Sequence, residues 1–385
     1  MKIMMISGLY PRHDLPQYGI FVKELCDALL KKSGIQIDVV VPVGGNETFT
    51  KTETWVAGKK MNIFYIPMFR VPMACNLFVS GHFLKREIEK YIGRDISKYD
   101  IFHGHGTIPE GYAAVMLAKK YRKKSVVHVH GLDAYFRLNI KKDSMAKMNY
   151  RYCKKTYEGA DLVLGVSNKV GENVKRGTEN VNVDTLYNGY NPVKFYSGSL
   201  KTQNSIFKII CVGNLIPIKG IEYLIDALEE VKEKGYKFQC DIFGRGILQE
   251  NLENKCKEYH LDEVIFKGYQ KSEVIAEAMR NSDLFVLPSY YEALGCVYLE
   301  AMASGIPVIA CESQGISEVI VNEETGILVK EKNSKEIADN IIRLIEEPEY
   351  YKKIQEKALE TVREYTWENT AQKLKNLYDL SLIHI

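Results

Sequence analysis

Short β-rich runs alternate with amphipathic segments of helical period along the whole chain. This alternation predicts parallel sheets joined by crossover helices. The first series of strand-like runs covers residues 3–7, 36–42, 62–66, 100–104, 125–130, 161–166 and 183–187. The second series covers residues 207–212, 238–243, 263–267, 283–287, 306–310 and 326–329. We therefore expect an α/β fold of two tandem doubly wound, Rossmann-like domains.

Turn-forming residues separate the two series. Residues 187–199 contain the steps Asn-Gly, Asn-Pro and Ser-Gly, which are typical of turns and linkers. We expect an N-terminal domain over 1–190, a linker over 191–204 and a C-terminal domain over 205–364. A helix over 365–383 is expected to pack back on the N-terminal domain. Ligands of doubly wound sheets bind at the carboxyl ends of the strands, so the cleft between the domains is the expected site.

The composition is that of a globular protein, with 46% hydrophobic and 26% charged residues. No long uncharged apolar run appears, and no signal-peptide pattern precedes the first strand-like run, so we expect a cytoplasmic protein. The eight cysteines are scattered without a C-x-x-C pair. A disulfide framework and a zinc site are therefore not expected.

The charge is distributed unevenly along the chain. Residues 1–195 hold 30 Lys and Arg against 18 Asp and Glu, a net charge of +12, whereas residues 196–385 carry −9. The basic run 119–124 and the apolar, proline-broken segment 61–83 suggest contact with an anionic membrane, such as the inner face of the cell membrane. The alternatives are a cationic helix end for the run and a buried strand and helix for the segment.

Two glutamates, Glu292 and Glu300, flank a predicted strand-to-helix turn. A strand ends near Ser289, and a helix is expected to begin at Gly295 or Cys296. The backbone N–H groups at this helix start, from Gly295, Cys296 and Val297, favour a phosphate.

Carboxylates beside that helix start repel phosphate but accept hydrogen bonds from vicinal hydroxyl groups. A ligand with a diphosphate in the middle and a diol at each end fits both features, and a nucleotide sugar is such a ligand. The alternative is a pair of glutamates that face solvent on an ordinary helix.

These residues lie in the stretch EALGCVYLEAMASGIPV (292–308), which resembles the E-x7-E signature of retaining glycosyltransferase family 4 with its two-domain GT-B fold. Further similar motifs follow the family's order: PQYGIFVKEL (16–25), VVHVHGLD (126–133), YNGYNPVKF (187–195), VGNLIPIKG (212–220) and FGRG (243–246). The resemblance implies an N-terminal acceptor-binding domain and a C-terminal domain that binds a nucleotide sugar.

The resemblance also implies roles for single residues. Glu300 would bind the nucleotide ribose, Glu292 the donor hexose, and Lys219 the diphosphate. His130 would approach the transferred sugar. The remaining implied donor contacts are Gly19, which brings a loop backbone to the phosphate, and Tyr269, in the region that contacts the base.

One position departs from the family pattern. Many members carry arginine where this chain has Asn214, and Arg245 either replaces that missing cation or is a solvated loop residue. The chain lacks a D-x-D motif, so no cofactor and no divalent metal are expected. Two histidine pairs, 103/105 and 128/130, could suggest a metal site, but hydrogen bonding to sugar hydroxyls explains them equally well, and no carboxylate or cysteine completes a ligand set.

We therefore expect a retaining glycosyltransferase that moves a hexose from a nucleotide diphosphate sugar to a cell-surface polysaccharide or its lipid-linked precursor. No nucleic-acid partner is expected. Two alternatives stay open, a sugar-nucleotide epimerase on the same fold and a non-catalytic nucleotide-sugar-binding subunit. A dinucleotide oxidoreductase is disfavoured, because no G-x-G-x-x-G follows the first strand of either domain.

Overall fold

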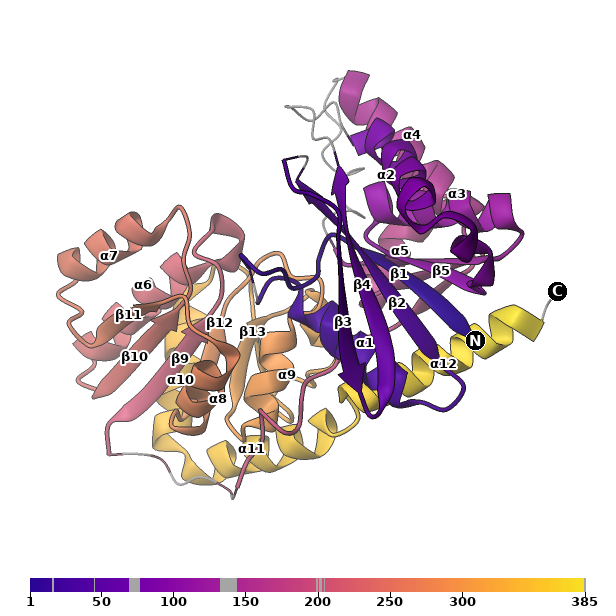
Figure 1. Cartoon of the computed structure of the whole chain (residues 1–385). Coiled ribbons are helices and arrows are strands. Elements are labelled where there is room, and N and C mark those ends of the chain that lie inside the picture. The colour runs from indigo at the N-terminus through magenta and orange to yellow at the C-terminus, as the bar shows by residue number, and fades with distance from the viewer. Residues whose placement is uncertain are drawn as a thin grey trace. The chain divides into compact units, whose positions relative to one another are not determined.

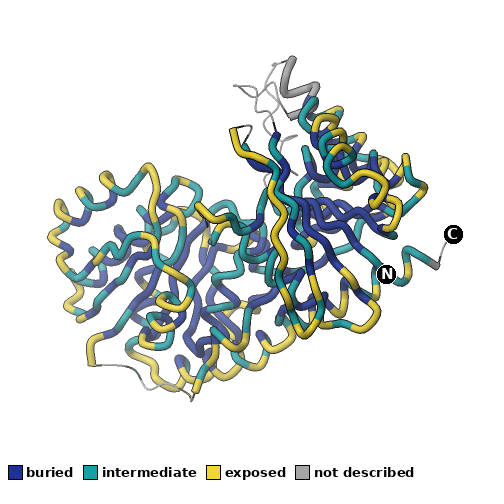
Figure 2. Tube along the Cα trace, viewed as in Figure 1, coloured by how far each residue is buried: buried dark blue, intermediate teal, exposed yellow. Residues whose placement is uncertain are grey.

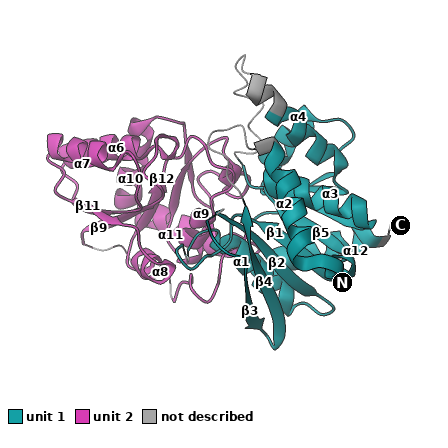
Figure 3. Cartoon of the chain, turned by 45° about the horizontal axis from the view of Figure 1, so that its top comes forward, with its two compact units in different colours: residues 1–188, 367–385 teal, residues 189–366 magenta. Residues whose placement is uncertain are grey.

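The computed structural model describes residues 1–15, 17–44, 46–68, 77–131, 144–198, 200, 203 and 205–383. The chain forms two compact units (Figure 3). Unit 1 comprises Met1–Asn188 together with Trp367–Ile385, and unit 2 comprises Gly189–Thr366. Residues 191–204 belong to unit 2.

Unit 1 contains an eight-stranded sheet in the order β3-β4-β2-β1-β5-β6-β7-β8 (Figure 1). All strand pairs are parallel except β3 with β4. The strands are β1 (Lys2–Ser7), β2 (Gln36–Gly44), β3 (Thr50–Val56), β4 (Lys59–Met68), β5 (Ile101–His105), β6 (Lys124–Val129), β7 (Leu162–Gly165) and β8 (Val183–Thr185). The order reverses between β1 and β5, which makes this the topological switch point of unit 1.

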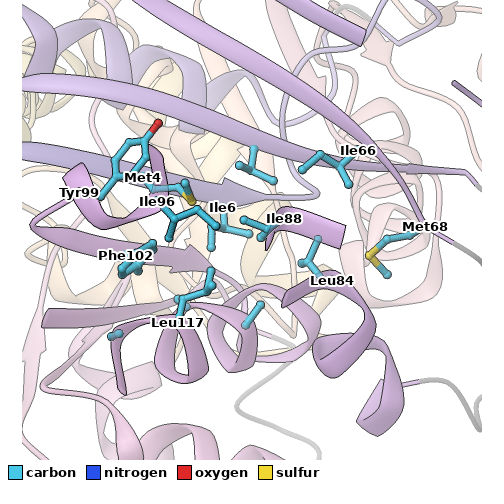
Figure 4. Packing of buried hydrophobic residues seen from close by; sticks show 14 residues of the cluster. Met4, Ile6, Ile66, Met68, Leu84, Ile88, Ile96, Tyr99, Phe102 and Leu117 are labelled. Carbon is cyan, nitrogen blue, oxygen red and sulfur yellow. The ribbon is translucent and has the colours of Figure 1, made fainter. Parts of the chain in front are cut away.

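Helices cover both faces of this sheet. They are α1 (Ile20–Lys31), α2 (Leu77–Ile92), α3 (Tyr112–Tyr121), α4 (Ser144–Gly159), α5 (Asn168–Gly177) and α12 (Trp367–Ile383). Figure 4 shows the core on one face, where Met4, Ile6 and Phe102 of the strands meet Leu84 and Leu117 of α2 and α3. Because side chains alternate along a strand, the residues beside Phe102 point to the other face.

The C-terminal helix α12 lies on that other face and is part of unit 1. It packs against α1, and the hydroxyl of its buried Tyr378 lies 2.5 Å from Nδ1 of His103 on β5. Lys373 of the same helix donates to the carbonyl oxygen of Thr185 at 2.6 Å. The helix therefore contacts both the middle and the β8 edge of the unit 1 sheet.

Unit 2 contains a six-stranded, all-parallel sheet in the order β11-β10-β9-β12-β13-β14. Its strands are β9 (Phe207–Val212), β10 (Phe238–Phe243), β11 (Val264–Gly268), β12 (Leu284–Leu287), β13 (Val308–Cys311) and β14 (Ile327–Val329). The helices are α6 (Ile221–Glu233), α7 (Gln249–Glu258), α8 (Ser272–Arg280), α9 (Cys296–Ala303), α10 (Ser334–Glu346) and α11 (Pro348–Val362). The strands form the dark core of Figure 2, with exposed helix faces around it.

The predicted fold class is confirmed, and the predicted strand runs lie on strands of the two sheets. One strand was missed. Strand β3 forms an antiparallel hairpin with β4 through Ala57 and Gly58, and most of its residues are exposed. An edge strand with two solvated faces lacks the apolar signal by which buried parallel strands are recognised.

Candidate active site

A pocket of about 310 Å³ opens in unit 2 at the carboxyl ends of β9, β10 and β12. Strand β12 lies on the opposite side of β9 from β10 (Figure 1). The pocket is therefore at the topological switch point of the sheet. Seven of the residues predicted to bind the donor line it: Asn214, Lys219, Tyr269, Glu292, Gly295, Cys296 and Val297. The structure thus gathers residues that are up to 83 positions apart in the sequence, from 214 to 297.

The floor of this pocket depends on two backbone segments in close contact. The N–H of Leu215, after β9, donates to the carbonyl oxygen of Arg245, after β10, at 3.0 Å. A Cβ atom at Gly244 would lie 1.9 Å from the carbonyl oxygen of Gly213, and one at Gly246 would lie 2.2 Å from that of Leu215. Only glycine permits this approach, which explains the FGRG sequence after β10.

The main charged feature of the pocket is an ion pair. The Nζ atom of Lys219 lies 2.5 Å from Oε2 of Glu292, and the two side chains are only 17% and 13% exposed. The loop that carries the glutamate is fixed by Gln314, whose Oε1 accepts the Glu292 N–H at 3.0 Å, and by the Gly315 N–H, which donates to the Glu292 carbonyl at 3.0 Å. An entering phosphate would therefore meet a lysine that is already oriented by its partner.

The start of α9 forms another wall of the pocket. Gly295 precedes the helix with φ 81°, and a Cβ atom there would lie 2.6 Å from the ring of Tyr298. The fully buried Tyr298 donates its hydroxyl to the carbonyl oxygen of Leu287 at 2.7 Å, which ties the first turn of α9 to the end of β12. The positive end of the helix dipole consequently faces the pocket.

Two predicted donor residues of unit 2 lie elsewhere. Among the described residues, neither Arg245 nor Glu300 lines the pocket. Arg245 is exposed, and its Nε lies 3.7 Å from the position of a Cβ atom on Gly268, the residue before Tyr269. Glu300 is half-buried on the second turn of α9. Their predicted roles, in charge neutralisation and ribose binding, stay predictions.

The other two predicted residues, Gly19 and His130, belong to unit 1. Gly19 begins α1 with φ 64°, and a Cβ atom there would lie 2.1 Å from the carbonyl carbon of Leu9. His130 follows β6, its ring centroid is 5.0 Å from that of Phe21 in the first turn of α1, and its Nε2 lies 3.0 Å from Nδ1 of His105. Burial and the neighbouring histidines hold the pKa of His130 well below its usual range, so its imidazole is neutral at pH 7.

One residue that contacts the candidate site, Gln314, was not singled out from the sequence, and the contact of His105 with His130 was not predicted. Gln314 orients the Glu292 loop and also donates to Glu331 at 2.6 Å, but nothing in its local pattern marks it. His105 contacts His130, and its His-x-His spacing on a predicted strand was the signal that could have paired them.

Two family models match consecutive parts of the chain. Residues 19–194 match the model described as Glycosyltransferase Family 4, and residues 195–361 match the model described as Glycosyl transferases group 1. The chain belongs to glycosyltransferase family 4. The predicted resemblance is therefore confirmed, and the two models meet within the few residues that follow the boundary between units 1 and 2.

Relatives of this glycosyltransferase span its whole length. The uncharacterized glycosyltransferase MJ1607 of Methanocaldococcus jannaschii is 28% identical, with 99% of each chain covered. TuaC of Bacillus subtilis, a glycosyltransferase named for teichuronic acid biosynthesis, is 24% identical, with 94% of each chain covered. The crystal structure of Anabaena HepE in complex with UDP-glucose aligns with a TM-score of 0.73 at 17% identity and covers 98% of this chain and 99% of its own, which shows the shared GT-B fold.

Replacing Arg245 tests whether its cation acts on the donor. Because the exposed guanidinium lies beside Gly268 at the edge of the pocket, we expect Arg245→Ala to raise KM for the donor of the glycosyltransferase less than tenfold, with kcat nearly unchanged. Steady-state kinetics with varied donor, alongside the control Lys267→Ala, provide the measurement. A loss of kcat as large as that of Lys219→Ala would instead make Arg245 the second cation of the diphosphate.

The buried histidines of the glycosyltransferase predict an acid-labile fold. Burial lowers the pKa of His128 to about 3 and that of His103 and His105 well below the usual range. Among the described residues, the titratable groups that contact these rings are the other histidines and Tyr378. The unfolded chain binds protons below its histidine pKa of about 6.5, so stability is complete above that pH and is lost as the pH falls toward 3, by about 1.4 kcal/mol per pH unit for each neutral histidine.

Urea unfolding at pH 7.5 and at pH 5.5 measures this loss. We expect a clear drop in the unfolding midpoint for the wild type and a smaller drop for His103→Gln. An equal drop in both proteins would show that the buried histidines do not carry the pH dependence.

Proposed function

We propose that this chain transfers a hexose from a nucleotide diphosphate sugar, with retention, to a cell-surface polysaccharide or its lipid-linked precursor. The observation that carries the proposal is the pocket in which Lys219, Glu292 and the start of α9 meet at the switch point of the unit 2 sheet. TuaC's name supports a cell-surface product, and the UDP-glucose bound to HepE makes uridine diphosphate sugars the first donors to test.

The donor's negative charge is met by this chain's own groups. Lys219 and the first turn of α9 stabilise the charge that develops on the nucleoside diphosphate as the glycosidic bond breaks. Glu292 accepts hydrogen bonds from hydroxyls of the donor hexose, and Glu300 accepts them from the ribose. Since a lysine and a helix start supply the positive charge, the proposed transfer requires no divalent metal.

His130 is proposed to hydrogen-bond the transferred sugar. Its lowered pKa keeps the ring neutral, so one nitrogen can donate and the other can accept. In unit 1 its Nε2 already lies 3.0 Å from His105 Nδ1, which leaves Nδ1 for the sugar. We propose that Gly19, at the start of α1, brings the loop backbone to the donor phosphate. We also propose, from the family resemblance, that unit 1 binds the acceptor.

Thermal unfolding of the purified protein against a panel of nucleotide sugars tests donor binding. A ligand at a hundredfold excess over its Kd stabilises the folded state by about 2.7 kcal/mol, which shifts the midpoint measurably. We expect one class of nucleotide diphosphate sugar to raise the midpoint and Lys219→Ala to abolish that rise. A panel without any shift would contradict the proposed donor site.

Two other functions stay distinguishable by product analysis. An epimerase would convert the nucleotide sugar without an acceptor, and a binding subunit would form no product under any condition. Transfer that depends on the acceptor separates the proposed enzyme from both alternatives.

The structure bears on the two sequence features that suggested membrane contact. In the basic run, Lys120 pairs with Glu89 at 2.7 Å and Lys124 with Asp161 at 3.2 Å. In the apolar segment, residues 61, 63, 66 and 68 are buried, which favours the alternative of a buried strand for this part. Phe69 and the side chain of Phe78 lie outside the described residues. Among the described residues, no helix is long and apolar enough to cross a bilayer.

We propose that the exposed cations of unit 1 bring the protein to an anionic leaflet. Neutralising Lys119, Lys120 and Arg122, all exposed at the end of α3, should weaken cosedimentation with vesicles that contain anionic lipid, since each cation near such a surface contributes roughly 1 kcal/mol. Added salt should release the wild type. The matched control neutralises three exposed lysines of α11, at 352, 353 and 357. Equal binding to neutral vesicles, or equal losses in both variants, would overturn this proposal.

A further inference from the structure

Four histidine rings gather on one face of the unit 1 sheet. His103 and His105 lie on β5, His128 lies beside His105 in the register of β6, and His130 follows that strand. The ring centroids of His103 and His105 are 4.5 Å apart, and those of His105 and His128 are 5.2 Å apart. The first three residues are fully buried or nearly so.

The hydrogen bonds of these rings are incomplete. Nδ1 of His103 meets the hydroxyl of Tyr378, and Nδ1 of His105 meets Nε2 of His130. Among the described residues, however, Nε2 of His103 and Nε2 of His105 have no hydrogen-bond partner, and the nitrogens of His128 meet at most the backbone of Leu186. Buried polar nitrogens almost always have a partner, and one group bound between the three rings would supply a partner to each of them.

We propose that His103, His105 and His128 bind one transition-metal ion of the zinc class through these nitrogens. One ring nitrogen from each residue lies within 4.8 Å of those of the other two. Neutral imidazole is the form that ligates metals, and a set of imidazoles without carboxylates suits zinc, copper or nickel and not magnesium or calcium. A three-histidine set leaves a fourth position for water.

The hydrogen bonds of the second ring nitrogens, Nδ1 of His103 and Nδ1 of His105, match those of metal-bound histidines. Such a histidine donates its second ring N–H to a nearby acceptor, which fixes the ring and its tautomer. With the metal on Nε2, His103 would donate from Nδ1 to the Tyr378 hydroxyl, and His105 would donate from Nδ1 to Nε2 of His130. The ion would thereby hold α12 against β5 and leave the proton of His130 on its Nδ1.

The three imidazole rings must move slightly closer together to bind one ion. Zinc–nitrogen bonds of about 2.1 Å place tetrahedral nitrogens about 3.4 Å apart, so binding draws the rings together by at most about 1.4 Å. The site is built only from unit 1 residues, whereas the donor pocket is built only from unit 2 residues. The proposal consequently does not depend on the proposed function.

Metal content and cobalt spectroscopy test this proposal. The protein, purified without a histidine tag and stripped with chelator, is titrated with Zn²⁺ under melting and with Co²⁺ under absorption spectroscopy. We expect one equivalent of bound metal, a higher melting midpoint with Zn²⁺, and visible Co²⁺ bands that exceed those of six-coordinate Co²⁺ several-fold. The exposed-histidine control His82→Ala should behave as the wild type, and donor-induced stabilisation should persist without metal.

His128→Ala and His103→Gln should each lose the bound equivalent and the midpoint rise. If His128→Ala fails to fold, His103→Gln and the wild-type titration still decide the question. The wild type binding no Zn²⁺ and showing no Co²⁺ bands would overturn the proposal, and so would a folded His128→Ala or His103→Gln that retains one equivalent.

Discussion

Lys219→Ala is expected to lower kcat/KM for the donor by on the order of a hundredfold or more. The Lys219 side chain is 17% exposed in the pocket, and its charge is proposed to act on the leaving diphosphate, where electrostatic stabilisation is stronger than in water. Because the lysine would meet the diphosphate both in the bound donor and as the glycosidic bond breaks, the loss should appear in both KM and kcat. Steady-state kinetics with the donor found in the thermal panel provide the measurement.

The matched control is Lys255→Ala. Lys255 pairs with Asp226 at 2.6 Å in the same unit but away from the pocket, so its removal deletes a comparable ion pair without touching the donor site. We expect its kcat/KM to stay within twofold of the wild type. Similar losses in both variants would mean that Lys219 acts through the stability of unit 2 and not on the diphosphate.

Glu292→Gln is expected to lower kcat by about tenfold or more, with a smaller change in KM. The carboxylate lies 2.5 Å from Lys219 in the pocket wall, at the place proposed for the reacting hexose, and groups that act more strongly in the transition state change turnover selectively. Glu300→Gln is expected to raise KM with kcat little changed, because the ribose keeps the same contacts throughout the reaction.

The kinetics of the two variants therefore separate the roles of the two glutamates. Glu263→Gln, which removes the carboxylate that pairs with Lys232 at 2.9 Å, serves as the control for a lost surface charge. Equal changes of kcat and KM in Glu292→Gln and Glu300→Gln would contradict the assignment of hexose to one and ribose to the other.

The fold could be predicted largely because its parallel strands are buried on both faces. Runs such as 284–287 and 308–311 are apolar throughout and stand between helical periods, which is the signature of crossover units. Strand β3 could not be found in this way. Thr50, Lys51, Thr52 and Glu53 are exposed, and the pairing of β3 with β4 depends on a hairpin whose Ala57 adopts a positive φ that alanine rarely takes.

The candidate site likewise contains residues that the local sequence indicates and residues that only tertiary packing brings in. Glu292 and Gly295 could be predicted because strand exit, glycine and helix start are consecutive in the sequence, whereas the role of Lys219 was implied only by the resemblance of VGNLIPIKG (212–220) to the family's motif. Gln314 comes from a loop after β13 and bears on Glu292 only through tertiary packing. The approach of His128 to His103 and His105 depends on the register between β5 and β6, which the sequence does not specify.

The most direct test of the central claim is the fate of the anomeric centre. The purified protein is incubated with the nucleotide sugar that stabilises it, with and without a glycan or lipid-linked acceptor, and the anomeric protons are followed by NMR. For a retaining glycosyltransferase we expect a glycoside with the donor's anomeric configuration. It should form together with nucleoside diphosphate, and only when the acceptor is present. Conversion of the nucleotide sugar without acceptor, or a product of inverted configuration, would contradict it.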